Sequence, residues 1–229
     1  MNTIWQFNQA HGPEIGKEYP QVQKTVGGYW DISAPIGVQN QLKDDFFPNG
    51  IPPFGQFKLH ANANLTDVLS TAMLPIRSTL ISPWCKSVLE TFKLGQHWFF
   101  PVELLTPSGK TLPYYVFHFN NDCSGSIDFS KSTFAISEYC WENFEMKEMG
   151  ELTFHNKLEY YAFMDDRKGR KGKTISPKKI TLDTSSIPQV DIFYLYRIGA
   201  VVHIKDSLRQ ALQEARISGW ECEPSWVVS

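Results

Sequence analysis

Six histidines are the residues of this chain best suited to acid–base or metal chemistry, because imidazole titrates near neutral pH. His97 and His118 lie in or beside two stretches that read as pairing strands, so their rings could approach each other. A two-histidine metal site needs a further ligand, for which Asp122 or Glu103 is available. A histidine on an aromatic strand is more often an ordinary sheet residue, however, and HExxH, GxSxG and GxGxxG are all absent. We therefore expect no metal site.

The other reactive side chains also favour structural interpretations. The serines at 124 and 126 flank a glycine, but no strand–turn–helix frame surrounds them, as a serine nucleophile requires. Cys85 sits one turn into an expected helix, where the helix dipole could lower its pKa, yet it falls on the apolar stripe. The carboxylate pairs at 44–45 and 165–166 are adjacent, and adjacent side chains of a strand face opposite ways. We expect no catalytic residues and no cofactor; a small hydrolase or metal-dependent enzyme is the weaker alternative.

Composition excludes several classes of function. The chain has 229 residues, 42% of them hydrophobic, a net charge of −2 and an isoelectric point near 6.3. A binder of nucleic acid normally carries a clear excess of Lys and Arg, so direct nucleic-acid binding is not expected. No apolar run approaches the ~18 residues of a membrane span, and the first ten residues lack the basic and apolar regions of a signal peptide. A cytoplasmic protein is expected.

Length and cysteine usage point to one self-sufficient domain over residues 1–229. A chain of this length buries enough apolar surface to fold without staples. Its four cysteines show no CxxC spacing and are expected to be buried free thiols. Self-association stays open, since closed homodimers are the commonest soluble oligomers.

Two helices carry the strongest local signals. Ser82 can cap a helix over about 82–94, Pro83 suits the first helical position, and Gly95 suits the end. A second helix over about 207–218 follows Asp206 as cap and ends at Gly219. In both units a cap, a helix, a glycine and an aromatic strand recur at one spacing.

Strand signals and turn residues complete the expected fold. Residues 97–102 and 112–119 read as strands of one hairpin, while 134–149 is compatible with helix or strand. Residues 1–64 are rich in Gly and Pro and are expected to wrap onto the core as a loop-rich segment. The basic run Arg167–Lys173 reads as an exposed loop, because it lacks phosphate-loop spacing. We predict an α+β fold, with a mainly antiparallel or mixed sheet and two principal helices packed on it.

Several short motifs resemble one known family. They are a Leu-Ile-Ser strand end at Leu80–Ser82, an aromatic-Phe-Pro-Val strand at Phe99–Val102 and a Tyr-rich strand at Tyr114–Phe119. An Ile-Asp-x-x-x-Ser element follows at Ile127–Ser132, and a strand–helix unit ending in Gly-aromatic-Glu lies within Asp191–Cys222. Together, across residues 65–225, they resemble the immunity proteins of bacterial polymorphic toxin systems, specifically the eleventh numbered immunity family. The resemblance implies a cytoplasmic protein that occludes the C-terminal effector domain of a cognate toxin and carries no catalytic residues.

The most acidic stretch is the expected partner interface. Residues 138–151 hold five glutamates and a single lysine. As a helix, this stretch would align Glu138, Glu142 and Glu145 on one side, with Glu148 nearby. Such a face suits a basic cleft, as in a toxin that cuts nucleic acid. The alternative of another class is a scaffold or regulatory module without a toxin partner.

Overall fold

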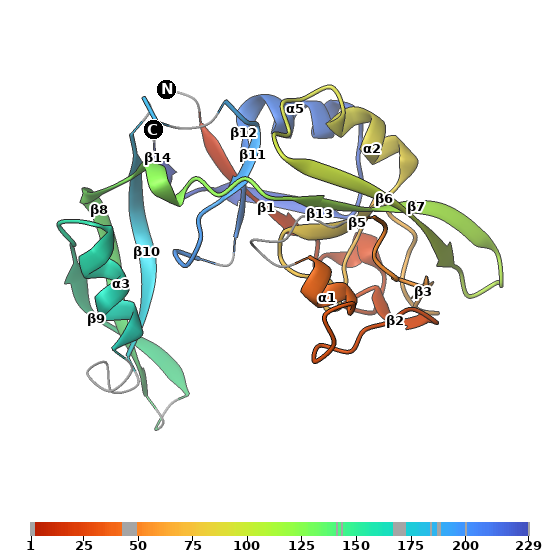
Figure 1. Cartoon of the computed structure of the whole chain (residues 1–229), viewed down its shortest axis with the longest axis horizontal. Helices are drawn as coiled ribbons and strands as arrows, with labels where there is room; N and C mark the ends of the chain where they lie inside the picture. The colour runs from red at the N-terminus through yellow and green to blue at the C-terminus, as the bar shows by residue number, and fades with distance from the viewer. Residues whose placement is uncertain are drawn as a thin grey trace.

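The computed structural model describes residues 3–42, 50–140, 142, 144–166, 173–183, 185–186, 189–199 and 201–228. Strands hold 43% of the structure and helices 17%, and the strands form three sheets (Figure 1). The expected α+β fold with two principal helices is therefore wrong, because the described helices are four short ones on a β-rich framework.

The first sheet joins the two ends of the chain. Its strand order is β11-β12-β1-β13, and all three pairings are antiparallel. The strands are β1 (Ile4–Gln9), β11 (Ile192–Tyr194), β12 (Val202–Lys205) and β13 (Trp220–Pro224). Because β1 lies in the middle of this sheet, the N-terminal segment is part of the framework and not only a wrapping.

The second sheet has six strands in the order β2-β3-β6-β7-β5-β4. They are β2 (Val22–Val26), β3 (Gln56–Leu59), β4 (Val68–Leu69), β5 (Ser78–Ile81), β6 (His97–Leu105) and β7 (Thr111–Phe119). The predicted hairpin is confirmed, with β6 and β7 in antiparallel register over their full length. Strands β3 and β6 run parallel, which makes this sheet mixed.

The two helices expected from the sequence are present but shorter. They are α2 (Pro83–Leu89) and α5 (Asp206–Glu214). The Ser82 hydroxyl accepts from the Cys85 N–H at 3.0 Å, so the predicted cap is confirmed. The predicted Asp206 cap is wrong: Lys205, which has extended backbone, is the N-cap, and Asp206 is the first helical residue. The Asp206 carboxylate accepts from the Trp5 indole at 2.9 Å. The predicted helix ends at Gly95 and Gly219 are wrong, because the C-cap residues are Glu90 and Ala215. The two glycines have φ of 62° and 83° and lie in the turns that lead into β6 and β13.

Each face of the second sheet covers a separate core. One face carries Ile81 and Phe117, which pack with α2, α5 and the inner face of the first sheet. The other face carries Leu80 and Val116, which pack against buried residues of the N-terminal segment; these are Val22, Val38, Leu42, Phe54, Phe57 and Leu59. Besides its strands, this segment contributes η1 (Pro13–Ile15) and α1 (Val38–Gln41).

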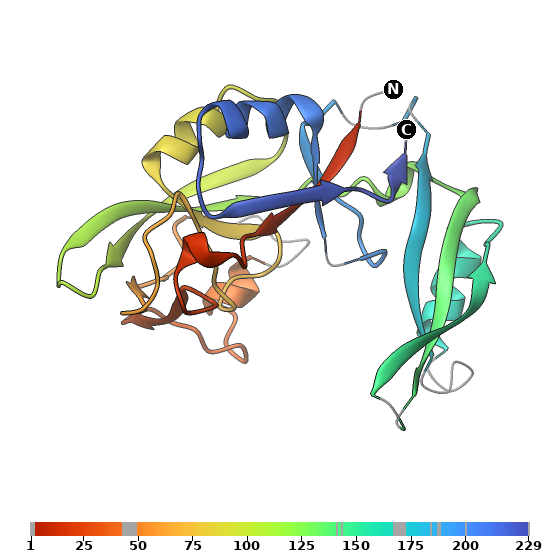
Figure 2. The same cartoon turned by 180° about the vertical axis from the view of Figure 1, so that it is seen from behind.

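The third sheet forms an arm that projects from the rest of the molecule (Figure 2). Its order is β14-β10-β8-β9, and its elements are η2 (Ser124–Ser126), β8 (Ile127–Cys140), β9 (Glu145–Leu152), α3 (Lys157–Asp165), β10 (Lys173–Leu182) and β14 (Val227–Val228). In the stretch 134–149, which the sequence left between helix and strand, residues 134–140 belong to β8 and residues 145–149 to β9, and the two strands pair antiparallel. The helical reading of the acidic stretch is therefore wrong.

Candidate functional site

The base of the arm is a compact aromatic cluster. Phe134 of β8 and Tyr160 of α3 are almost fully buried, with ring centroids 5.0 Å apart. Phe154 meets both rings, and Phe129 lies 5.4 Å from Tyr160. The Tyr160 hydroxyl donates to the Arg197 carbonyl at 2.8 Å, which ties α3 to the chain beyond β11. These contacts fix the root of the hairpin, so its tip extends from a packed base.

The hairpin register divides the predicted interface glutamates between two faces. Cys140 lies opposite Glu145, and Ser137 lies opposite Glu148. Residues directly opposite one another share a face, and alternate residues along a strand share a face. Glu138 and Glu145 are thus on one face of the arm, and Glu148 is on the other.

Glu148 is paired with a lysine on the surface of the arm. The Lys178 ammonium of β10 contacts the Glu148 carboxylate at 2.6 Å and the Glu151 carboxylate at 2.8 Å. The hydrogen bonds that Lys178 donates to Glu148 and then to Glu151 raise the pKa of Lys178. Glu148 therefore links β9 to β10 across the intervening strand, on the face opposite Glu138 and Glu145 and not beside them.

The tip of the hairpin combines acidic and apolar side chains in solvent. Glu142 and Glu145 are exposed there, and the Phe144 side chain between them is 75% exposed. Met146 and Met149 of β9 are each 51% exposed. Phe144 also has a φ of 58°, a conformation that is unfavourable for a bulky residue and that recurs at functional sites.

Sequence reasoning found the glutamates of this tip but missed its apolar residues. The apolar residues Met146, Met149 and Leu152 recur every three positions, a spacing that favours a helix and so gave no sign of an exposed hairpin. In the structure this stretch is a strand with a β-bulge: Ile136 pairs with Gly150 while Ser137 pairs with Glu148, so Met149 is the extra residue.

The structure does not bring the two strand histidines together. His97 lies opposite Phe119, while His118 lies opposite Trp98, so the imidazoles occupy opposite faces of the second sheet. The Nδ1 atom of His118 is 2.7 Å from the Ser78 hydroxyl, and the ring is fully buried. Burial, with a smaller contribution from nearby Arg77, lowers the pKa of His118 to about 4.

His203 on β12 is a second buried histidine whose ring lies beside a serine hydroxyl, as that of His118 does. The Nδ1 atom of His203 is 3.1 Å from the Ser225 hydroxyl, and the fully buried ring lies between Phe193 and Trp226. Burial lowers the pKa of His203 to about 3. Nε2 of His203 has no hydrogen-bond partner, and the same is true of His118. Both rings are therefore neutral and out of reach of a substrate.

The cysteine, serine and aspartate considered from the sequence have structural roles. Burial and then the Asp67 charge raise the pKa of the Cys85 thiol, so this thiol is neutral. Ser124 donates to the Asp122 carboxylate at 2.8 Å. Asp165 pairs with Arg197.

No group of three or more His, Cys, Asp or Glu side chains in the described ranges is placed to hold a metal ion. The predicted basic loop lies outside the described residues except for Lys173, and so does the carboxylate pair at 44–45.

Comparison with protein-family models and with curated proteins gives no match to this chain. Among the described residues, no helix has the length and apolar character needed to cross a membrane.

Proposed function

We propose that this chain is a non-enzymatic binding protein whose β8–β9 hairpin engages a basic partner protein. We further propose that the partner is the C-terminal effector domain of a toxin, so that the chain acts as an immunity protein in the cytoplasm of the producing cell. The observation that carries the proposal is the hairpin tip, where exposed Phe144 stands between Glu142 and Glu145 on a projecting arm.

The tip has the two components of a steered protein interface. Phe144, Met146 and Met149 offer apolar anchors of the kind that dominate binding energy once a partner removes them from water. Glu142 and Glu145 add negative charge, which speeds association with a basic surface and disfavours acidic partners. An effector that cuts nucleic acid has a basic cleft, and the narrow hairpin has the shape to enter one.

The edge position of β9 adds a further means of attachment. In the described sheet β9 pairs with β8 on one side and lies at the edge of the strand order. An edge strand presents backbone N–H and C=O groups that a partner strand can use. The buried base around Phe134 limits the ordering cost of binding, because the hairpin is already positioned.

The test is a toxicity rescue by co-expression with the effector domain encoded next to this gene. The unmodified chain should restore growth and co-purify with the effector in a stoichiometric complex. Reversing the tip charge with Glu142→Lys and Glu145→Lys should slow association at low salt and weaken rescue. The matched control changes Glu14 and Glu214, which are exposed and outside the arm, to Lys and should leave both unchanged.

A second variant separates anchoring from steering. Phe144→Ser removes the exposed ring without changing charge, and it should mainly accelerate dissociation, by roughly tenfold or more for a true anchor. Absence of any complex with the effector domain would refute the immunity assignment. A complex that is insensitive to both tip variants would refute the role of the arm.

A further inference from the structure

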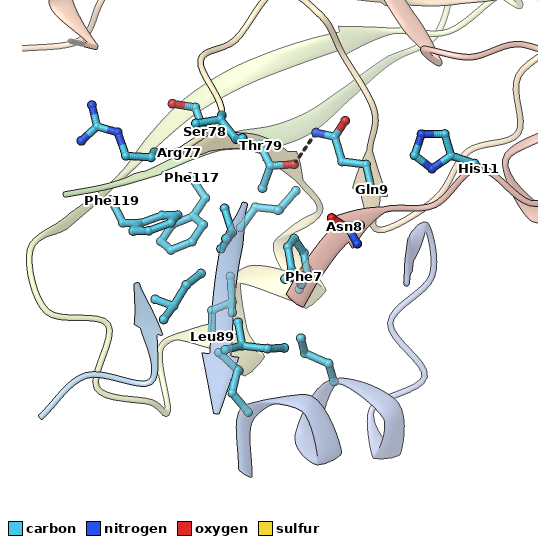
Figure 3. A pocket seen from close by; sticks show the side chains of 18 of the residues that line it. Phe7, Asn8, Gln9, His11, Arg77, Ser78, Thr79, Leu89, Phe117 and Phe119 are labelled. Carbon is cyan, nitrogen blue, oxygen red and sulfur yellow. Dashed lines mark hydrogen bonds between the residues drawn. The ribbon is translucent and has the colours of Figure 1, made fainter. Parts of the chain in front are cut away.

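A cavity of about 220 Å³ extends into the molecule from its surface, away from the hairpin arm (Figure 3). It sits where the first and second sheets meet beneath α2 and α5. Its apolar walls come from all of these elements and include Phe7, Leu89, Phe117, Ile204 and Leu212. Protein interiors are close-packed and contain few voids larger than a water molecule, so a space of this size is unusual.

The size and lining of the cavity set the class of molecule that it suits. An engineered apolar cavity of about 150 Å³ in another protein stays dry and accepts benzene. The present cavity is larger, and Phe7, Phe117 and Phe119 give it aromatic walls. A single-ring or fused bicyclic aromatic molecule fits this volume, whereas drug-sized ligands need roughly 300 Å³ or more.

The polar side chains gather at one end of the cavity, where β1 and β5 approach each other (Figure 3). There the Gln9 side-chain amide donates to the Thr79 hydroxyl at 3.3 Å. This bond leaves the Thr79 hydroxyl hydrogen and the Gln9 amide oxygen available, one donor and one acceptor. A hydroxyl or N–H group on a ligand can bond to this pair.

The same end does not favour a charged ligand. No carboxylate is among the residues that line the cavity, so an ammonium group would lack a partner. The Arg77 guanidinium bonds to Asn120 and to the Tyr194 hydroxyl, and Figure 3 shows it directed away from the rings of Phe117 and Phe119. Moving a charge into such walls without a partner is costly.

The other basic side chain at this end, His11, is also engaged. The Nδ1 atom of His11 lies 3.1 Å from the Glu221 carboxylate, and the ring is tilted against that of Tyr19, with centroids 4.2 Å apart. A ligand carboxylate would therefore meet neither a free guanidinium nor a free imidazole. The lining selects for neutral molecules.

We propose that this cavity is a binding site for a small neutral aromatic molecule with one hydroxyl or N–H group, which bonds to Gln9 and Thr79. The site is independent of the hairpin arm and uses none of its residues. The chain would then bind a small molecule at a site separate from its proposed protein interface.

Phenol and indole are the probes, with toluene as the probe that lacks a polar group. Binding to the full-length chain is measured by calorimetry and by the shift in melting temperature. Phenol and indole should bind saturably at millimolar concentration or below and raise the melting temperature. Leu212→Phe fills the cavity and should weaken binding by roughly tenfold or more, since the ring then occupies the ligand volume. Leu158→Phe, on the exposed face of α3, is the matched control and should bind normally.

Thr79→Val provides a test that does not depend on filling the core. It keeps the shape of the side chain and removes the hydroxyl, so it should reduce the preference for phenol over toluene while leaving toluene binding unchanged. No saturable binding of phenol or indole to the unmodified chain overturns the proposal. Undiminished binding in folded Leu212→Phe, or an unaltered phenol preference in Thr79→Val, overturns the assigned location.

Discussion

Two fully buried histidines should make the fold sensitive to mild acid. His118 and His203 have pKa values of about 4 and about 3 in the folded chain, because burial disfavours the charged ring. In the unfolded chain each titrates near 6.5. Between these values the unfolded state binds more protons than the folded state, so the free energy of unfolding decreases as the pH falls. The free energy of unfolding therefore has its full value above pH ~6.5 and decreases progressively below that pH.

The size of the loss follows from those pKa values. Lowering the pH from 7 to 5 should reduce the free energy of unfolding by about 2 kcal/mol for each ring, or about 4 kcal/mol for both. Carboxylates whose pKa is lowered in the folded chain, such as Asp31, Asp128 and Asp206, do not contribute, because they titrate below this window. A loss of this size is a large part of the stability of a typical domain.

The assay is urea unfolding at pH 7 and pH 5, followed by tryptophan fluorescence. His118→Gln and His203→Gln should each remove about half of the pH-dependent loss, whatever their effect on absolute stability. His155→Gln is the control, because His155 is exposed in the folded chain. Stabilities at pH 5 and pH 7 that agree within about 1 kcal/mol would refute the reasoning.

Three substitutions test the packing that positions the two sites, each by chemical denaturation. Asp67→Ala should cost about 2–4 kcal/mol, since its carboxylate accepts from the Ser82 hydroxyl at 2.7 Å and from Ser218 at 2.8 and 3.0 Å; a cost below about 1 kcal/mol would contradict this. Gly219→Ala should destabilise severely, because a Cβ there would lie 2.1 Å from the Val68 carbonyl oxygen, whereas Gly109→Ala, with similar φ and open space, should cost only about 1 kcal/mol. Equal effects would be inconsistent with the close approach at Gly219. Phe134→Ala should cost about 3–5 kcal/mol and increase amide exchange in β8 and β9, and unchanged exchange there would show that the aromatic base does not hold the arm.

Local signals in the sequence located several elements well. Ser82 and Pro83 determine where α2 begins, because a hydroxyl cap and a missing N–H both suit the first turn of a helix. The Tyr- and Phe-rich run of β7 was predictable as a strand for a similar reason, since side chains that fit a pleated, half-buried surface recur along it. These assignments depend on neighbours a few residues apart.

The acidic stretch shows where such reasoning fails. Its apolar residues recur every three positions, which favours a helix, but Met149 is the extra residue of a β-bulge. The bulge arises where β9 pairs with β8, and that pairing involves β8 residues that are not neighbours of Met149 in the sequence. The register then places Glu138 and Glu145 on one face and Glu148 on the other, a division that no local pattern contains.

The sequence by itself determined the chemical character of this protein: near-neutral charge, abundant aromatic core residues, free thiols and one concentrated acidic segment. Only the tertiary structure decided how these residues are combined. Strand β1 pairs with β12 and β13, which lie about two hundred residues away in the sequence. The cavity exists because those strands meet β5 and β7 beneath two helices. Pairings at this separation follow from burial of whole faces against one another, and the identity of nearby residues does not specify them.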